Sequence, residues 1–158
     1  MKAAKRTTLQ TTKQRGFTTI EIVLVLVIIG ILGTLVLTTR AGVQQNQRNT
    51  ERQRDIKELR DGLEGYFANF SQYPTLTNLN DPTWRAINLK ALEASAFQDP
   101  SDTGSPARIA DKPAAHIYAY SVTSASGAPC GSPTAPCTQY TLTATLEGGG
   151  TYTKSNLN

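Results

Sequence analysis

Residues 16–37 read GFTTIEIVLVLVIIGILGTLVL, a largely apolar stretch with one charged residue. Residues 22–39 form an uncharged run of 18 residues, which is ~27 Å long as a helix and spans the hydrocarbon core of a bilayer. A buried strand is the alternative, but strands rarely exceed ~10 residues, and so small a chain could not cover both faces of such a strand. The run therefore predicts a membrane helix.

Basic residues are concentrated before this run. Of the 16 Lys and Arg residues, five lie in the first sixteen positions, where there is no acid, which leaves 11 against 12 Asp and Glu in the rest. The positive-inside rule then places residues 1–16 in the cytoplasm and everything after Arg40 outside the membrane. Because the net charge of +4 belongs to this N-terminal segment, it does not indicate binding to nucleic acid.

One carboxylate, Glu21, stands inside the apolar sequence. Such a group costs about 2.5–3.5 kcal/mol near the centre of a membrane helix, and less at its end, so it requires a partner. No A-x-A-like cleavage site follows the apolar run, so we expect this run to be retained. If the chain were cut after Gly16, the new α-amine of Phe17 would lie one helical turn from Glu21, and stacked identical subunits could neutralise each other's charges. A simple signal anchor with a stray glutamate is the alternative.

The sequence Gly16-Phe17-Thr18-Thr19-Ile20-Glu21, followed by the apolar run, resembles the class III signal of type IV prepilins and of type II secretion pseudopilins. This resemblance implies that a membrane peptidase cuts after Gly16 and methylates the amine of Phe17, and that Glu21 is the carboxylate used in filament assembly. The partners that it implies are identical subunits in a helical filament, the prepilin peptidase and methyltransferase, and an inner-membrane assembly platform with its ATPase.

A second helical segment follows the apolar run. Apolar residues three or four positions apart predict one stripe of an amphipathic helix that packs on a sheet, while the charged residues are expected to face solvent. We expect one helix from about Thr18 to Phe70, because Pro74 forbids its continuation. The stripe comprises Ile56, Leu59, Leu63, Phe67 and Phe70, and the charged positions are Arg52, Arg54, Lys57, Glu58, Arg60, Asp61 and Glu64.

The rest of the chain predicts short elements. Asp81-Pro82 opens a short helix that continues to Phe97, residues 98–115 form a loop, and period-two alternation predicts strands over 116–122, 139–146 and 151–155. We therefore expect an α+β, type IV pilin-like fold, in which a long N-terminal helix, half of it transmembrane, packs on a small antiparallel sheet. The expected organisation is a removed leader (1–16), a transmembrane half-helix (17–39) and an extracytoplasmic globular domain (40–158) that includes the stalk helix 40–70.

Cys130 and Cys137 lie in the loop between the first two predicted strands, on the side of the membrane where disulfides form, so we expect them to pair. The only histidine is His116, which leaves zinc binding without a ligand set. The resemblance to major pseudopilins implies a possible calcium site in an acidic loop, here with Asp99 and Asp102 as ligands. That loop lacks EF-hand order, and a merely solvated loop is the alternative.

The expected function is that of a pilin, a structural subunit that polymerises into a type IV pilus-like filament. A type II secretion pseudopilin is the first alternative, and a minor pilin for DNA uptake or adhesion is the second. No motif of a catalytic or phosphate-binding site occurs, so no enzymatic activity and no cofactor other than calcium is expected. The subunit would reside in the membrane before assembly and in a surface filament, or an envelope pseudopilus, afterwards.

Overall fold

The computed structural model describes residues 16–104 and 107–157, except for the side chains of residues 35–41. The chain divides into two compact units, Met1–Ala41 and Gly42–Asn158, and the helix α1 (Thr19–Phe70) contributes residues to both. The predicted leader lies outside the described residues, apart from Gly16. Around α1 the second unit adds three strands and three short helical segments.

The apolar stripe of α1 forms one wall of the core in the second unit. Ile56, Leu59 and Leu63 are almost completely buried, as their spacing predicts, whereas Phe70 is 52% exposed and lies outside the core. The helix ends where predicted, because Ser71 adopts a left-handed conformation (φ 53°) and its N–H donates to the carbonyl of Phe67 at 2.7 Å. This bond satisfies a carbonyl that the helix would otherwise leave without a partner.

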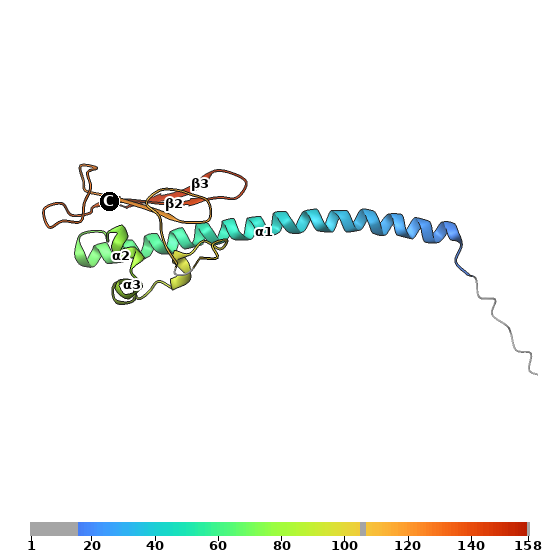
Figure 1. The fold of residues 1–158 in the computed structure, drawn as a ribbon, viewed down its shortest axis with the longest axis horizontal. Coiled ribbons are helices and arrows are strands. Elements are labelled where there is room, and N and C mark those ends of the chain that lie inside the picture. The colour runs from blue at the N-terminus through green and yellow to red at the C-terminus, as the bar shows by residue number, and fades with distance from the viewer. Residues whose placement is uncertain (1–15, 105–106, 158) are drawn as a thin grey trace, which may run out of the picture. The chain divides into compact units, whose positions relative to one another are not determined.

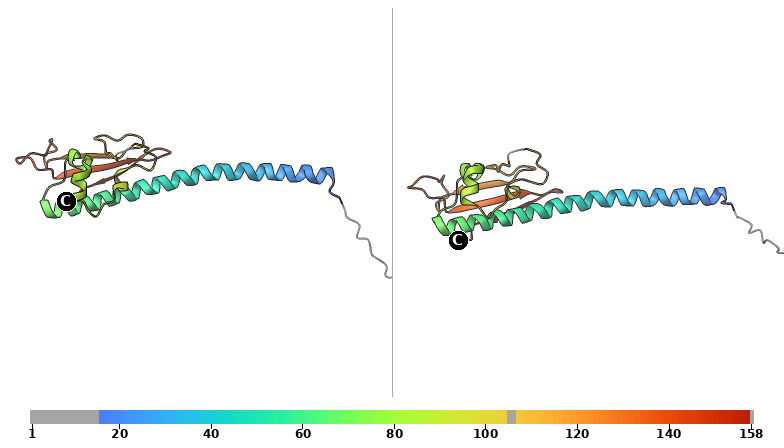
Figure 2. Two further views of the ribbon diagram at one scale, coloured as in Figure 1. Left: turned by 60° about the horizontal axis from the view of Figure 1, so that its bottom comes forward. Right: turned by 90° about the horizontal axis from the view of Figure 1, so that it is seen from below.

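An antiparallel sheet packs against the stripe. Its order is β1 (Ala119–Thr123), β2 (Gln139–Thr145) and β3 (Thr151–Ser155), with Tyr120 opposite Leu142 and Leu142 opposite Lys154. Figures 1 and 2 show the sheet along the part of α1 that belongs to the second unit. The predicted α+β fold is thus confirmed. The core includes Ile56, Leu59, Leu63, Tyr73, Leu79, Phe97, Ile109, Tyr118, Tyr120, Tyr140 and Leu142.

The first strand starts later than predicted. His116 has a φ of 60°, which lies in the left-handed region and is incompatible with a strand, so β1 begins only at Ala119. Ala114 and Ile117 form an isolated bridge on either side of this turn. The alternation of the sequence therefore predicts the presence of this strand but not the residue at which it begins.

The predicted helix that starts at Asp81-Pro82 is shorter than expected. Asp81 caps α3 (Pro82–Asn88) by accepting hydrogen bonds from Thr83 N at 2.8 Å and Trp84 N at 3.3 Å. Leu89 leaves the helical conformation (φ −124°), and the chain continues through a turn into the 3-10 helix η1 (Ala94–Phe97). A preceding helix, α2 (Leu76–Asn80), is not predicted by the sequence pattern, because five residues are too few to show a period.

Candidate assembly site

The bond between Gly16 and Phe17 lies before the start of α1. Residues 16–18 have no regular secondary structure, and the side chain of Phe17 is 79% exposed. A peptidase binds its substrate in an extended conformation, so a non-helical, exposed bond is the kind that it can reach. The structure thus presents the predicted cleavage position on accessible backbone.

Glu21 lies in the first turn of α1 and forms a capping box with Thr18. The Thr18 amide donates to Oε2 of Glu21 at 3.4 Å, and the Glu21 amide donates to Oγ1 of Thr18 at 3.3 Å. The negative carboxylate also faces the positive end of the helix dipole, which stabilises it. In this arrangement Oε1 of Glu21 remains available for a further donor.

The apolar side chains on either side of Glu21, from Ile20 to Leu32, are exposed in the single chain. Each of them is between 47% and 76% exposed, which is far more apolar surface than a soluble monomer presents as one patch. Apolar patches of this size generally mark protein–protein or membrane contact sites. The residues are Ile20, Ile22, Val23, Leu24, Val25, Leu26, Val27, Ile28, Ile29, Ile31 and Leu32.

Within the described part of the chain, no helix is both long and apolar enough to cross a membrane. Side chains 35–39 of the predicted span 22–39 lie outside the described residues.

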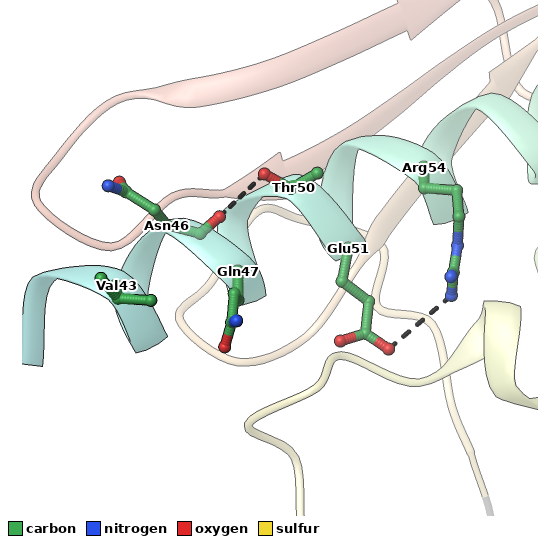
Figure 3. Close-up of a pocket in the computed structure, with 6 residues that line it drawn as sticks. All are labelled: Val43, Asn46, Gln47, Thr50, Glu51 and Arg54. Atoms are coloured by element: carbon green, nitrogen blue, oxygen red, sulfur yellow. Dashed lines mark hydrogen bonds and ion pairs between the residues drawn. The ribbon is translucent and has the colours of Figure 1, made fainter. Parts of the chain in front are cut away.

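A shallow groove of about 580 Å³ runs along α1 at the start of the second unit (Figure 3). All of its lining side chains come from one helix, and two contacts order them: Thr50 Oγ1 donates to the carbonyl of Asn46 at 2.8 Å, and Arg54 lies 3.7 Å from Glu51. The lining is Val43, Asn46, Gln47, Thr50, Glu51 and Arg54.

One residue of the charged set on α1, Arg52, is buried, contrary to the expectation that the whole set faces solvent, and so is Asp55, an acidic residue outside that set. Arg52 is 1% exposed and Asp55 is 2% exposed. Arg52 forms a bidentate pair with Asp99, with Nε–Oδ2 at 2.6 Å and Nη2–Oδ1 at 2.8 Å. The hydrogen bonds to Asp99 raise the pKa of Arg52 above its usual value, so it is permanently charged.

Asp55 faces the sheet rather than water. Its Oδ2 accepts a hydrogen bond from the hydroxyl of Tyr118 at 2.7 Å, and its Oδ1 lies 3.2 Å from Nη2 of Arg54. Burial raises the pKa of Asp55, and these two donors oppose the rise. Asp55 thereby ties α1 to the residue that precedes β1.

Glu147 follows β2 and binds back to α1. Its Oε1 and Oε2 each accept a hydrogen bond of 2.6 Å from Arg48, and Oε1 also accepts one of 2.9 Å from Arg52. These contacts lower the pKa of Glu147 to about 2, and the hydrogen bonds from Arg48 make the largest contribution. The sequence pattern does not indicate these ion pairs of Glu147, because its partners lie almost one hundred residues earlier in the chain.

The predicted disulfide is present. Cys130 and Cys137 are joined with an S–S distance of 2.03 Å. The bond closes the loop between β1 and β2, and Cys137 is buried in the core while its carbonyl accepts a hydrogen bond from Tyr73 N at 2.7 Å. The loop is thus fastened to the chain that follows α1.

The acidic loop named as a possible calcium site is arranged differently from a metal site. Asp99 is buried and binds Arg52, while Oδ1 of Asp102 accepts a hydrogen bond from the amide of Gly104 at 2.8 Å. Among the described residues, no three His, Cys, Asp or Glu side chains are grouped as metal ligands. The cation that Asp99 binds is therefore the guanidinium of Arg52.

Several curated proteins are similar to this chain, and each is named "Type II secretion system core protein G". The protein from Escherichia coli (strain K12) is 35% identical over 85 residues, which is 54% of this chain and 59% of that protein. The protein from Klebsiella michiganensis is 43% identical over 65 residues, or 39% and 44% of the two chains. The protein from Pectobacterium carotovorum is 33% identical over 98 residues, or 60% and 55%.

The chain spans about half the length of the curated relatives that it matches. No family model matches the chain. No solved structure matches it either. The prepilin-type sequence at Gly16–Glu21, the long helix packed on a three-stranded antiparallel sheet, and these relatives agree with one another. Over the matched residues the chain is similar to type II secretion pseudopilins, in agreement with the resemblance of its N-terminal sequence to the type IV pilin and pseudopilin family.

Proposed function

We propose that this chain is a pseudopilin, a structural subunit that polymerises into the filament of a type II secretion system. The main support for this proposal is the similarity of the chain to relatives that are all named as a core protein of that system. The type IV pilus, which the sequence alone favoured, is the second candidate, because the same N-terminal chemistry serves both kinds of filament. No catalytic role is proposed.

Cleavage after Gly16 would create the group that Glu21 needs. The new α-amine of Phe17 carries a positive charge four residues before the carboxylate, so each subunit would hold both charges at one end of its helix. In a filament with an axial offset, the amine of one subunit would reach Glu21 of its neighbour. Removal of residues 1–16 leaves Thr18 in place, so the capping box that holds Glu21 survives processing.

The exposed apolar side chains of residues 20–32 support a two-stage assembly. Lipid would cover them while the subunit waits in the membrane, with residues 17–39 as the half-helix that crosses it and the globular domain outside the cytoplasm. Neighbouring subunits would cover them in the filament. The prepilin peptidase, the assembly platform and its ATPase are the partners required for this transfer.

The experiment is to replace the gene in its host with the variants Glu21→Ala and Glu93→Ala. Glu93 is an exposed glutamate outside α1 and serves as the matched control. We expect Glu21→Ala to be processed normally but to be absent from filaments and to stop secretion, whereas Glu93→Ala behaves as wild type. Incorporation of Glu21→Ala into filaments would contradict the assembly role, and loss of surface fibres with intact secretion would identify a pilus instead.

A further inference from the structure

The guanidinium of Arg52 is held by a complete set of acceptors. Nε and Nη2 bind the two oxygens of Asp99, Nη2 also donates to Oγ of Ser101 at 2.9 Å, and Nη1 donates at 2.9 Å to Oδ1 of Asn49 and to Oε1 of Glu147. A guanidinium has five N–H groups, so every donor of this buried side chain is used.

These acceptors come from three parts of the second unit. Asn49 belongs to α1, Asp99 and Ser101 to the loop after η1, and Glu147 to the turn between β2 and β3. Asn49 additionally exchanges hydrogen bonds with the backbone of Glu147, at 3.0 Å to its carbonyl and 2.9 Å from its amide. One cation on α1 thus fastens two loops that are distant in sequence.

Carboxylate, amide and hydroxyl oxygens are the ligands that calcium prefers, but here they do not fit a metal ion. Both oxygens of Asp99 already accept hydrogen bonds from Arg52, and Oδ1 also accepts one of 2.8 Å from the Ser101 amide. The positive charges of Arg48 and Arg52 balance the negative charges of Asp99 and Glu147. The cluster therefore has no surplus negative charge to offer to a divalent cation.

We propose that Arg52 supplies, as part of the chain, the cation that holds these two loops on α1, so that the globular unit keeps its fold without calcium. The resemblance to major pseudopilins implies a possible calcium site in an acidic loop, and the chemistry of this cluster does not fit that site. The inference concerns the second unit alone and does not rest on the proposed function.

The first test measures thermal unfolding of the full chain in detergent micelles, followed by the fluorescence of its single tryptophan, Trp84. One sample contains millimolar Ca²⁺ and the other contains a chelator. We expect the two midpoints to agree. A midpoint that rises by several degrees in Ca²⁺ would overturn the proposal, because the fold would then depend on the metal.

The second test compares Arg52→Lys, Arg52→Met and the control Arg60→Met under the same conditions. Arg60 is a matched control because it is also on α1, but its partner Asp61 is exposed. Arg52→Met leaves Asp99 buried without a cation and should lower the midpoint by roughly 10–20 °C. Arg52→Lys keeps the positive charge but has fewer N–H donors, so its unfolding midpoint should lie between those of wild type and Arg52→Met. The midpoint of Arg60→Met should stay close to that of wild type.

Equal midpoints for Arg52→Lys and Arg52→Met would contradict the proposal, because packing rather than charge would then explain the role of Arg52. If Arg52→Met does not fold, the proposal requires Arg52→Lys to fold without Ca²⁺, and its failure to do so would count against the proposal. These measurements use purified protein, so their outcome is independent of whether the chain assembles into a filament.

Discussion

Leu92 packs directly on Gly62, so closely that a Cβ atom at this glycine would overlap the leucine Cδ1. Gly62 lies on α1, and Leu92 lies in the turn between α3 and η1. A glycine within a helix lowers the stability of the helix by about 1 kcal/mol relative to alanine. The packing of Leu92 against Gly62 offsets this loss. Gly62 thereby fixes how near the short helices approach α1.

Replacement of Gly62 by alanine should therefore destabilise the protein by about 1–3 kcal/mol, because Leu92 must move. Gly65 is the matched control: it lies one turn further along α1, and nothing occupies the space where its Cβ would stand. Gly65→Ala should stabilise the protein by about 0.5–1 kcal/mol. Urea denaturation of both variants checks this pair, and a Gly62→Ala variant as stable as Gly65→Ala would contradict the close contact.

The disulfide closes a short loop and should contribute to stability mainly by restricting the unfolded chain. We expect the double variant Cys130→Ser and Cys137→Ser to lose about 2–3 kcal/mol in the free energy of unfolding. Reduction of the wild type should produce a loss of similar size, whereas reducing agent should not affect the double variant. A wild type that is indifferent to reduction would show that the bond does not stabilise the fold.

Stability should decrease at alkaline pH because of three buried tyrosines. Burial raises the pKa of Tyr118, Tyr120 and Tyr140 well above the usual value of 10, and hydrogen bonds to Asp55 and Glu64 raise it further for the first and third. Above pH 10 the unfolded chain loses protons that the folded chain keeps, so the free energy of unfolding falls by about 1.4 kcal/mol per pH unit for each tyrosine.

Denaturation at several pH values, together with the absorbance of tyrosinate, measures this effect. Tyr118, Tyr120 and Tyr140 should ionise only as the protein unfolds. Tyr118→Phe should reduce the slope of stability against pH by the contribution of one proton. Ionisation of all six tyrosines near pH 10 in the folded protein would contradict the burial of these side chains.

Much of this fold follows from local sequence patterns. The stripe Ile56, Leu59 and Leu63 and the strands predicted over 139–146 and 151–155 depend on spacing within a few residues, whereas the disulfide was predicted from the compartment in which its cysteines were expected to lie. The capping box of Thr18 and Glu21 also has a sequence signature. Local periodicity thus predicted the helix on which Glu21 lies.

The buried charges could not be predicted in the same way. The partners of Arg52 lie 47 and 95 residues away, so no local pattern reveals them. One signal was present: Arg52 stands four residues before Ile56 and continues the apolar stripe in the direction of the N-terminus. A charged residue on a buried stripe indicates that an opposite charge must reach it.

We expect the chain to be cut after Gly16 and used as a filament subunit from Phe17 onward. Intact mass and N-terminal peptide mapping of the protein recovered from cells, with and without the prepilin peptidase, test this expectation most directly. The chain should begin at N-methylated Phe17 in cells that have the peptidase and should retain residues 1–16 in cells that lack it. Retention of those residues in both kinds of cell would show that the chain is not processed as a prepilin.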